Sequence, residues 1–186
     1  PWSTNGNGLR PEHLDRILSC LQDSSDYIVI DTAPSLDATT VGALQVADRI
    51  VVVLTPEMTA LRNARLFVST TQSWGLLREN LVLVLNRHGM HGGIKSKDIE
   101  RSLQTRLDLT LPDADTLVTH SINRGVPLVL SHKRTPLARG IVRLAEMLVS
   151  GLGEEPEAAQ APRRFSLRGL WPFRAPRGLW PSRRKA

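Results

Sequence analysis

Short apolar runs alternate with segments of helical periodicity along most of this chain. Four runs rich in β-branched residues or leucine end at polar or proline positions, which predicts strands over residues 27–31, 49–54, 81–86 and 107–111. Elsewhere apolar residues recur at spacings of three and four, which predicts helices over residues 11–23, 37–47, 57–74, 97–106, 115–123 and 136–151.

This alternation of strands and helices predicts an α/β fold. Runs of this kind are typical of strands buried on both faces, as in a parallel sheet covered by helices on either side. Strand–helix–strand order also favours right-handed crossovers. We therefore expect a doubly wound, mostly parallel sheet with helices on both faces.

The predicted strand over residues 27–31 ends at Asp31, which introduces the first candidate chemistry. Open α/β sheets bind ligands at the carboxyl ends of their strands. A carboxylate at that edge is typical of a Walker B element, which holds Mg²⁺ directly or through water, opposite nucleotide phosphates. The same carboxylate would also suit a simple cap of the next helix, and this stretch alone favours neither interpretation.

Five short motifs stand at the ends of these predicted elements. They are residues 28–34 (IVIDTAP), 47–56 (ADRIVVVLTP), 84–87 (VLNR), 111–113 (LPD) and 123–128 (NRGVPL). In this order they resemble the ParA/MinD class of deviant-Walker P-loop ATPases, over about residues 9–151. Residues 62–64 (RNA) and 92–94 (GGI) are similar to the CpaE branch of that class, which is linked to pilus assembly and polar localisation.

The resemblance implies a nucleotide site built from several of these positions. Asp31 matches the Walker B carboxylate that positions Mg²⁺ through a water molecule, and Thr32–Pro34 match the switch that responds to the γ-phosphate. Asn86 matches the residue that hydrogen-bonds adenine, whose edge offers a donor and an acceptor to an amide. Pro112 and Asp113 match the loop that borders adenine. A turn cap at Asn86 and an ordinary turn at 112–113 remain as alternatives.

The chain departs from this class in one essential element. The class has a phosphate loop of the form Lys-Gly-Gly-x-Gly-Lys-Thr after a first strand, and no segment here matches it. Residues 92–96 (GGIKS) lack the glycine before the lysine and follow Asp31, so we interpret them as a surface loop. The chain begins with Pro1, which favours the C-terminal portion of a longer ATPase domain over a protein that lacks the loop. No catalytic residue is assigned, and ATP and Mg²⁺ are expected in the intact parent rather than on this chain alone.

Composition and residue spacing argue against an internal disulfide, a membrane span, a zinc site and a serine hydrolase. Cys20 is the single cysteine of the 186 residues, which excludes an internal disulfide and fits a reducing cytosol. No apolar run reaches the ~18–20 residues of a membrane span. His88 and His91 lie close in sequence but have no cysteine or acidic partner at zinc spacing, and no G-x-S-x-G elbow occurs.

The net charge of +6 is concentrated in a tail. Residues 163–186 contain eight Lys or Arg and no acid, whereas residues 1–162 have 16 basic and 18 acidic residues. The tail repeats RGLWP at 168–172 and 177–181 and follows a linker over 153–162. Its prolines disfavour a helix, and we expect disorder in isolation. The basic and Trp residues of the tail suit contact with an anionic membrane surface or with pilus machinery. Nucleic-acid binding is a weaker alternative, and a tail that binds no specific partner is a third interpretation.

The resemblance to the ParA/MinD class implies an ATP-binding regulator of spatial positioning, or of pilus or secretion assembly. The expected organisation is an ATPase-domain portion over residues 1–152, the linker and the tail. The class resemblance implies ATP-dependent homodimerisation and a cytoplasmic location, peripheral at the inner face of the membrane. The alternative is a scaffold of the same fold that binds no nucleotide and reaches its partner through the tail.

Overall fold

The structure is a computed structural model that describes residues 11–76 and 78–150. The described residues belong to two compact units, one up to Ala43 and the other from Leu44 onward, and each is described by itself. The predicted linker and the basic tail lie outside the described residues.

The first unit contains helix α1 (Pro11–Gln22), an irregular segment and the start of helix α2 (Ala38–Val46). The predicted strand over residues 27–31 is wrong, because these residues form no strand in the structure. Tyr27 is 60% exposed and Val29 is 93% exposed, so the segment is not buried on both faces either. An apolar, β-branched run becomes a strand only where a neighbouring strand pairs with its backbone groups. The described sheet offers residues 27–31 no such partner.

Helix α2 begins where Asp37 caps it. The Asp37 carboxylate accepts hydrogen bonds from the backbone N–H of Thr40, at 2.9 Å, and from the Ser35 hydroxyl, at 3.0 Å. These two bonds hold the pKa of the Asp37 carboxyl below its ordinary value of 3.8. A short polar side chain that satisfies an amide of the first turn is the usual N-cap arrangement.

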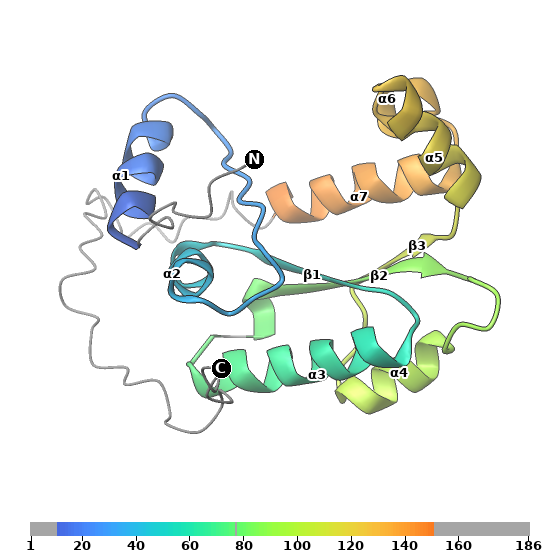
Figure 1. Cartoon of the computed structure of the whole chain (residues 1–186), viewed down its shortest axis with the longest axis horizontal. Helices are drawn as coiled ribbons and strands as arrows, with labels where there is room; N and C mark the ends of the chain where they lie inside the picture. Colours follow the sequence, from blue (N-terminus) through green and yellow to red (C-terminus); the bar gives the residue numbers. More distant parts are fainter. Residues whose placement is uncertain (1–10, 77, 151–186) are drawn as a thin grey trace, which may run out of the picture. The chain divides into compact units, whose positions relative to one another are not determined.

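The second unit is built on a parallel sheet with strand order β1-β2-β3 (Figure 1). The strands are β1 (Ile50–Leu54), β2 (Leu81–His88) and β3 (Leu109–Pro112). The helical elements are α3 (Met58–Ser73), η1 (Arg78–Asn80), α4 (Ser96–Leu103), α5 (Asp115–Arg124), α6 (Leu128–Ser131) and α7 (Pro136–Ser150). The predicted α/β fold with a parallel sheet is therefore confirmed, whereas the short elements η1 and α6 were not predicted.

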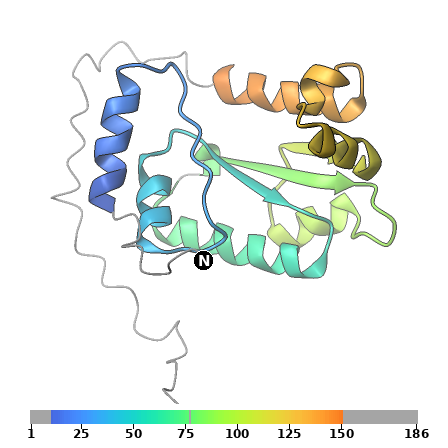
Figure 2. The same cartoon turned by 45° about the horizontal axis from the view of Figure 1, so that its top comes forward.

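Helices cover both faces of this sheet (Figure 2). Leu83 and Leu85 of β2 belong to a core cluster with residues of α3 and α4. Val82 and Val84 point to the opposite face and belong to a second cluster with residues of β3, α6 and α7. Successive side chains of a strand point to opposite faces, so an unbroken apolar run serves two cores at once.

An Arg–Asp pair connects the amino ends of β2 and β3. The Arg78 guanidinium donates to the Leu81 carbonyl oxygen and lies 3.0 Å from the Asp108 carboxylate. The same Asp108 oxygen accepts the backbone N–H of Leu83, at 2.7 Å. The pair therefore fixes the position at which the two strands begin to run side by side.

No helix among residues 11–76 and 78–150 is long and apolar enough to cross a membrane.

We predict that Leu83→Ala lowers the free energy of unfolding by about 2–5 kcal/mol, because Leu83 is fully buried and its removal leaves a cavity. Urea denaturation followed by circular dichroism measures the change. Leu66→Ala is the matched control, since Leu66 is 60% exposed on α3, and it should change stability by less than about 0.5 kcal/mol. An equal decrease in the free energy of unfolding of Leu83→Ala and Leu66→Ala would contradict the central position of β2.

We also predict an acid transition at the start of α2. The pKa of Asp37 is depressed, so the stabilisation by its charged form is present above pH 3.8 and is lost as pH falls through the folded-state pKa. The ¹⁵N chemical shift of the Thr40 amide should therefore titrate with a midpoint below 3.8. Asp37→Asn keeps a capping oxygen but has no titrating group, and this transition should disappear in it. A Thr40 titration that persists in Asp37→Asn would assign the effect to another acid.

Candidate functional site

The ends of β2 and β3 meet at an irregularity in the sheet. Leu85 pairs with Thr110 and His88 pairs with Pro112, so β2 has one more residue than β3 between these two pairs. Asn86 and Arg87 occupy this bulge. A bulge turns the side chains that it contains away from the regular alternation of the strand, and bulges often lie beside functional sites.

Arg87 has an unusual backbone conformation within this bulge. Its φ angle is 55°, in the left-handed region that non-glycine residues seldom adopt. Its guanidinium lies 3.2 Å from the Asp113 carboxylate and 3.9 Å from the Asp115 carboxylate. The strained conformation therefore accompanies a side chain that joins β2 to the loop after β3.

A backbone hydrogen bond reinforces the same connection. The Asp113 N–H donates to the His88 carbonyl oxygen at 3.0 Å. With the ion pair from Arg87, this bond holds Pro112 and Asp113 beside the end of β2. The structure thus brings together three of the residues predicted for the adenine side of the site: Asn86, Pro112 and Asp113.

The Asn86 side chain is partly engaged by its own turn. Its Oδ1 atom accepts the backbone N–H of Arg87 at 2.9 Å, which is the cap arrangement that the sequence left open. The amide NH₂ group has no hydrogen-bond partner among the described residues, and a carbonyl oxygen has a second lone pair. The amide therefore keeps donor and acceptor capacity for a heterocycle edge.

Asp31 and Thr32 lie in the irregular segment of the first unit. Both residues are exposed, and the Asp31 carboxylate has no hydrogen bond or ion pair to another described residue. The next helix is capped by Asp37 and not by Asp31, which removes the alternative role suggested by the sequence. An exposed carboxylate with free oxygens fits the oxygen ligands that Mg²⁺ prefers.

The glycine loop after β2 has a packing role. The backbone N–H of Ile94 donates to the Pro56 carbonyl oxygen at 2.9 Å. A Cβ atom on Gly93 would lie 3.0 Å from both the Met90 carbonyl oxygen and the Pro56 ring. Glycine at position 93 therefore lets the loop approach the end of β1. Residues 92–95 form a loop as expected, whereas Ser96 already begins α4.

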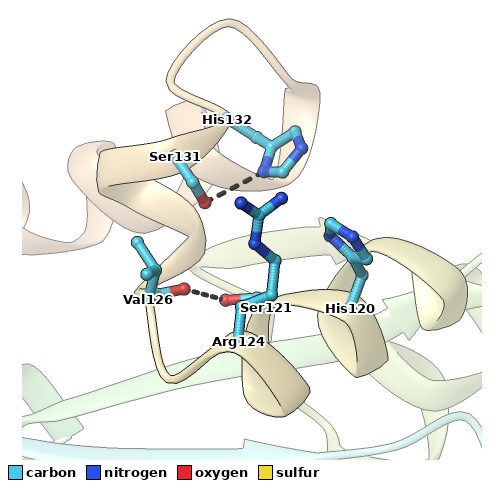
Figure 3. Close-up of a pocket in the computed structure, with 6 residues that line it drawn as sticks. All are labelled: His120, Ser121, Arg124, Val126, Ser131 and His132. Carbon is cyan, nitrogen blue, oxygen red and sulfur yellow. Dashed lines mark hydrogen bonds between the residues drawn. The ribbon is translucent and has the colours of Figure 1, made fainter.

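Two features of the second unit were not predicted from the sequence. Arg87 was part of a motif but was given no role, because only the fold shows its pairing with Asp113. A hollow between α5 and α6 brings together His120 and His132, which are twelve positions apart (Figure 3). No cluster of three or more His, Cys, Asp or Glu suited to a metal occurs within the part of the chain that the structure describes.

We predict that Arg87→Gln loosens the loop after β3, because it removes the charge that pairs with Asp113 and Asp115. Hydrogen–deuterium exchange at the Asp113 amide should accelerate about two- to fivefold, as expected for loss of a partly exposed ion pair. Arg101→Gln is the control, since it removes the Arg101–Asp98 pair within α4 and should leave Asp113 unchanged. Equal exchange in the wild type and Arg87→Gln would contradict this role.

Comparisons with known proteins agree with these motifs. A family model described as an AAA domain matches residues 5–81. The septum site-determining protein MinD of Thermotoga maritima is 27% identical over 128 residues, which are 66% of this chain and 47% of that protein. The chain thus spans about half the length of the curated relatives it matches.

Solved structures show the same fold. A ParA-family ATPase from Chlorobium tepidum matches with a TM-score of 0.67 at 22% identity, over 74% of this chain and 57% of that one. MinD of Pyrococcus horikoshii, solved with Mg-ADP, matches with a TM-score of 0.64 at 21% identity, over 77% and 58%. The MinC:MinD complex of Aquifex aeolicus matches with a TM-score of 0.62 at 21% identity, over 83% and 64%. In sequence this chain is similar to MinD proteins, and its fold is similar to those of solved MinD and ParA-family structures.

Proposed function

We propose that this chain is the part of a ParA/MinD-like ATP-binding protein that contacts the adenine and the magnesium ion. The observation that carries the proposal is the bulge in β2, which places Asn86 beside Pro112 and Asp113 at the carboxyl ends of two parallel strands. Ligands of open α/β sheets bind at this edge. The resemblance in sequence assigns these same three residues to the adenine side.

The residues present suit the adenine group in their chemistry. The free NH₂ group of Asn86 is a donor, and the second lone pair of its carbonyl oxygen is an acceptor. The ion pair between Arg87 and Asp113 positions the bordering loop, so that Pro112 is held against the end of β2. In this proposal, the pair orients the loop and does not itself bind the base.

Asp31 is the proposed ligand of the magnesium ion, through a water molecule. Its exposed carboxylate has no partner among the described residues, which leaves its oxygens free for a hydrated cation. Thr32 follows it directly and is the proposed switch residue that responds to the γ-phosphate. Magnesium bound there would neutralise the charge that develops on the phosphates of ATP.

The phosphates of ATP also need a binding loop, and this chain contains no recognised phosphate-binding motif. No segment of the 186 residues matches the Lys-Gly-Gly-x-Gly-Lys-Thr loop. We therefore propose ATP binding and ATP-dependent homodimerisation for the intact protein and not for this chain alone. MinD of Pyrococcus horikoshii, solved with Mg-ADP, supports this proposal by its similar fold.

A finer role follows from the motifs that resemble the CpaE branch. Residues 62–64 and 92–94 are the basis for proposing a function in pilus or secretion assembly, as opposed to septum placement. The basic tail over residues 163–186 is the proposed contact with the inner face of the membrane or with the assembly machinery. A relative from Aquifex aeolicus was solved as a MinC:MinD complex, which supports a protein partner for this fold.

A scaffold without nucleotide is the second candidate. It is favoured by one specific observation, namely that Asn86 Oδ1 and the Asp113 carboxylate already bind groups of Arg87. A protein that had lost nucleotide binding could keep this arrangement for stability alone. Its partner would then be reached through other surfaces or through the tail.

ATP-dependent dimerisation of the full-length protein separates the two candidates. Light scattering should show the dimer mass with ATP and Mg²⁺ and the monomer mass without them. Asp31→Ala should abolish this response without unfolding the protein, because it removes the proposed magnesium ligand. The matched control is Asp23→Ala, an exposed acid just after α1, which should dimerise normally. A wild-type mass that does not respond to ATP would favour the scaffold.

A further inference from the structure

A hollow of about 280 Å³ lies between the end of α5 and the end of α6. His120, Ser121 and Arg124 of α5 line it, together with Val126, Ser131 and His132 (Figure 3). The lining contains an arginine, two imidazoles and two hydroxyls, and it contains no acid. The two hydroxyls donate to the carbonyl oxygens of Val126 and Pro127, so the guanidinium and the imidazoles are the groups left to donate to a ligand.

The segment of the chain that forms the hollow is basic. Residues 116–145, which include most of α5, all of α6 and the first part of α7, contain no aspartate or glutamate. The same thirty residues contain five cationic side chains, namely Arg124, Lys133, Arg134, Arg139 and Arg143. A concave site within a region of one sign of charge concentrates ions of the opposite sign. The hollow therefore favours an anion.

The backbone around the hollow is held in place by local bonds. Gly125 ends α5 in the left-handed conformation, with φ of 63°, and the chain turns there toward α6. The Ser121 hydroxyl donates to the Val126 carbonyl oxygen across this turn. This bond fixes the spacing between α5 and α6, so Arg124 of α5 and His132 after α6 face one hollow before any ligand binds.

The side chains that face the hollow keep donor capacity. The Arg124 guanidinium runs from α5 toward His132 and has no hydrogen bond or ion pair with any described residue (Figure 3). The His132 Nδ1 atom lies 2.9 Å from the Ser131 hydroxyl, which itself donates to the Pro127 carbonyl oxygen. This contact orients the ring and leaves the Nε2 atom without a partner among the described residues. The His120 ring stands edge-on to that of His132, with centroids 6.2 Å apart.

We propose that this hollow binds the phosphate group of a small phosphomonoester or of inorganic phosphate. Arg124 would supply a planar pair of N–H donors, as arginine does in phosphate sites. The imidazoles of His120 and His132 approach from other directions, which suits a tetrahedral oxyanion better than a planar carboxylate. The hollow uses none of the residues proposed for ATP, so the two sites are independent.

Calorimetric titration of the protein with inorganic phosphate, without nucleotide and at constant ionic strength, tests the proposal. We expect saturable binding, and Arg124→Gln should weaken it by roughly tenfold or more, as for the loss of a charge-assisted hydrogen bond. Arg143→Gln is the matched control, because it removes an exposed arginine of α7 that does not line the hollow. It should retain wild-type affinity within about twofold. His132→Ala should also weaken binding, and circular dichroism should show that all variants fold.

Two further arms identify the source of the phosphate group. If the natural ligand is soluble, glycerol 3-phosphate should compete with inorganic phosphate for the hollow. Binding to phosphatidic acid vesicles that depends on Arg124 would instead assign the site to a lipid headgroup. Equal affinities in the wild type, Arg124→Gln and Arg143→Gln would place the anion elsewhere and overturn the proposal. Absence of saturable binding to all three phosphate probes would overturn it as well. Neither result depends on ATP binding at Asn86 or Asp31.

Discussion

The burial of β2 on both faces is the constraint on which the second unit depends. Leu83, Val84 and Leu85 have no exposed surface, and their side chains enter two separate cores. A strand buried in this way can tolerate neither an unpaired backbone group nor a polar side chain in its middle. Both neighbours of β2 and the helices on both faces must therefore be in place for this strand to be stable.

Polar side chains appear on β2 only where this constraint ends. Arg78 and Asp108 join β2 to β3 at their amino ends, and Arg87 and Asp113 join them at their carboxyl ends. The Arg78–Asp108 pair lies where the two strands pair regularly, whereas the Arg87–Asp113 pair lies across the bulge. The carboxyl end thus has an irregular backbone held by polar contacts, which is the condition under which a sheet edge can present side chains to a ligand.

The second unit carries its two candidate sites on different kinds of structure. The adenine side is formed by strand ends, whose positions follow from the register of the sheet. The hollow is formed by the end of α5, a glycine turn and the short helix α6, within a stretch of the sequence that has basic residues and no acid. Binding at the adenine side would depend on the geometry of the Asn86 amide, whereas binding at the hollow would depend chiefly on charge. The two sites therefore differ in how salt should affect them.

The sequence by itself determined the strands and the longer helices of the second unit, because their apolar periodicity is local and strong, whereas the short elements η1 and α6 have no such pattern. It also determined which residues stand at the ends of strands, including Asn86 and Asp113. Only the tertiary structure decided that residues 27–31 remain outside the sheet, since a strand needs a partner that its own residues do not specify. Likewise, the pairing of Arg87 with Asp113 and of His120 with His132 depends on contacts between distant segments, which no local pattern encodes.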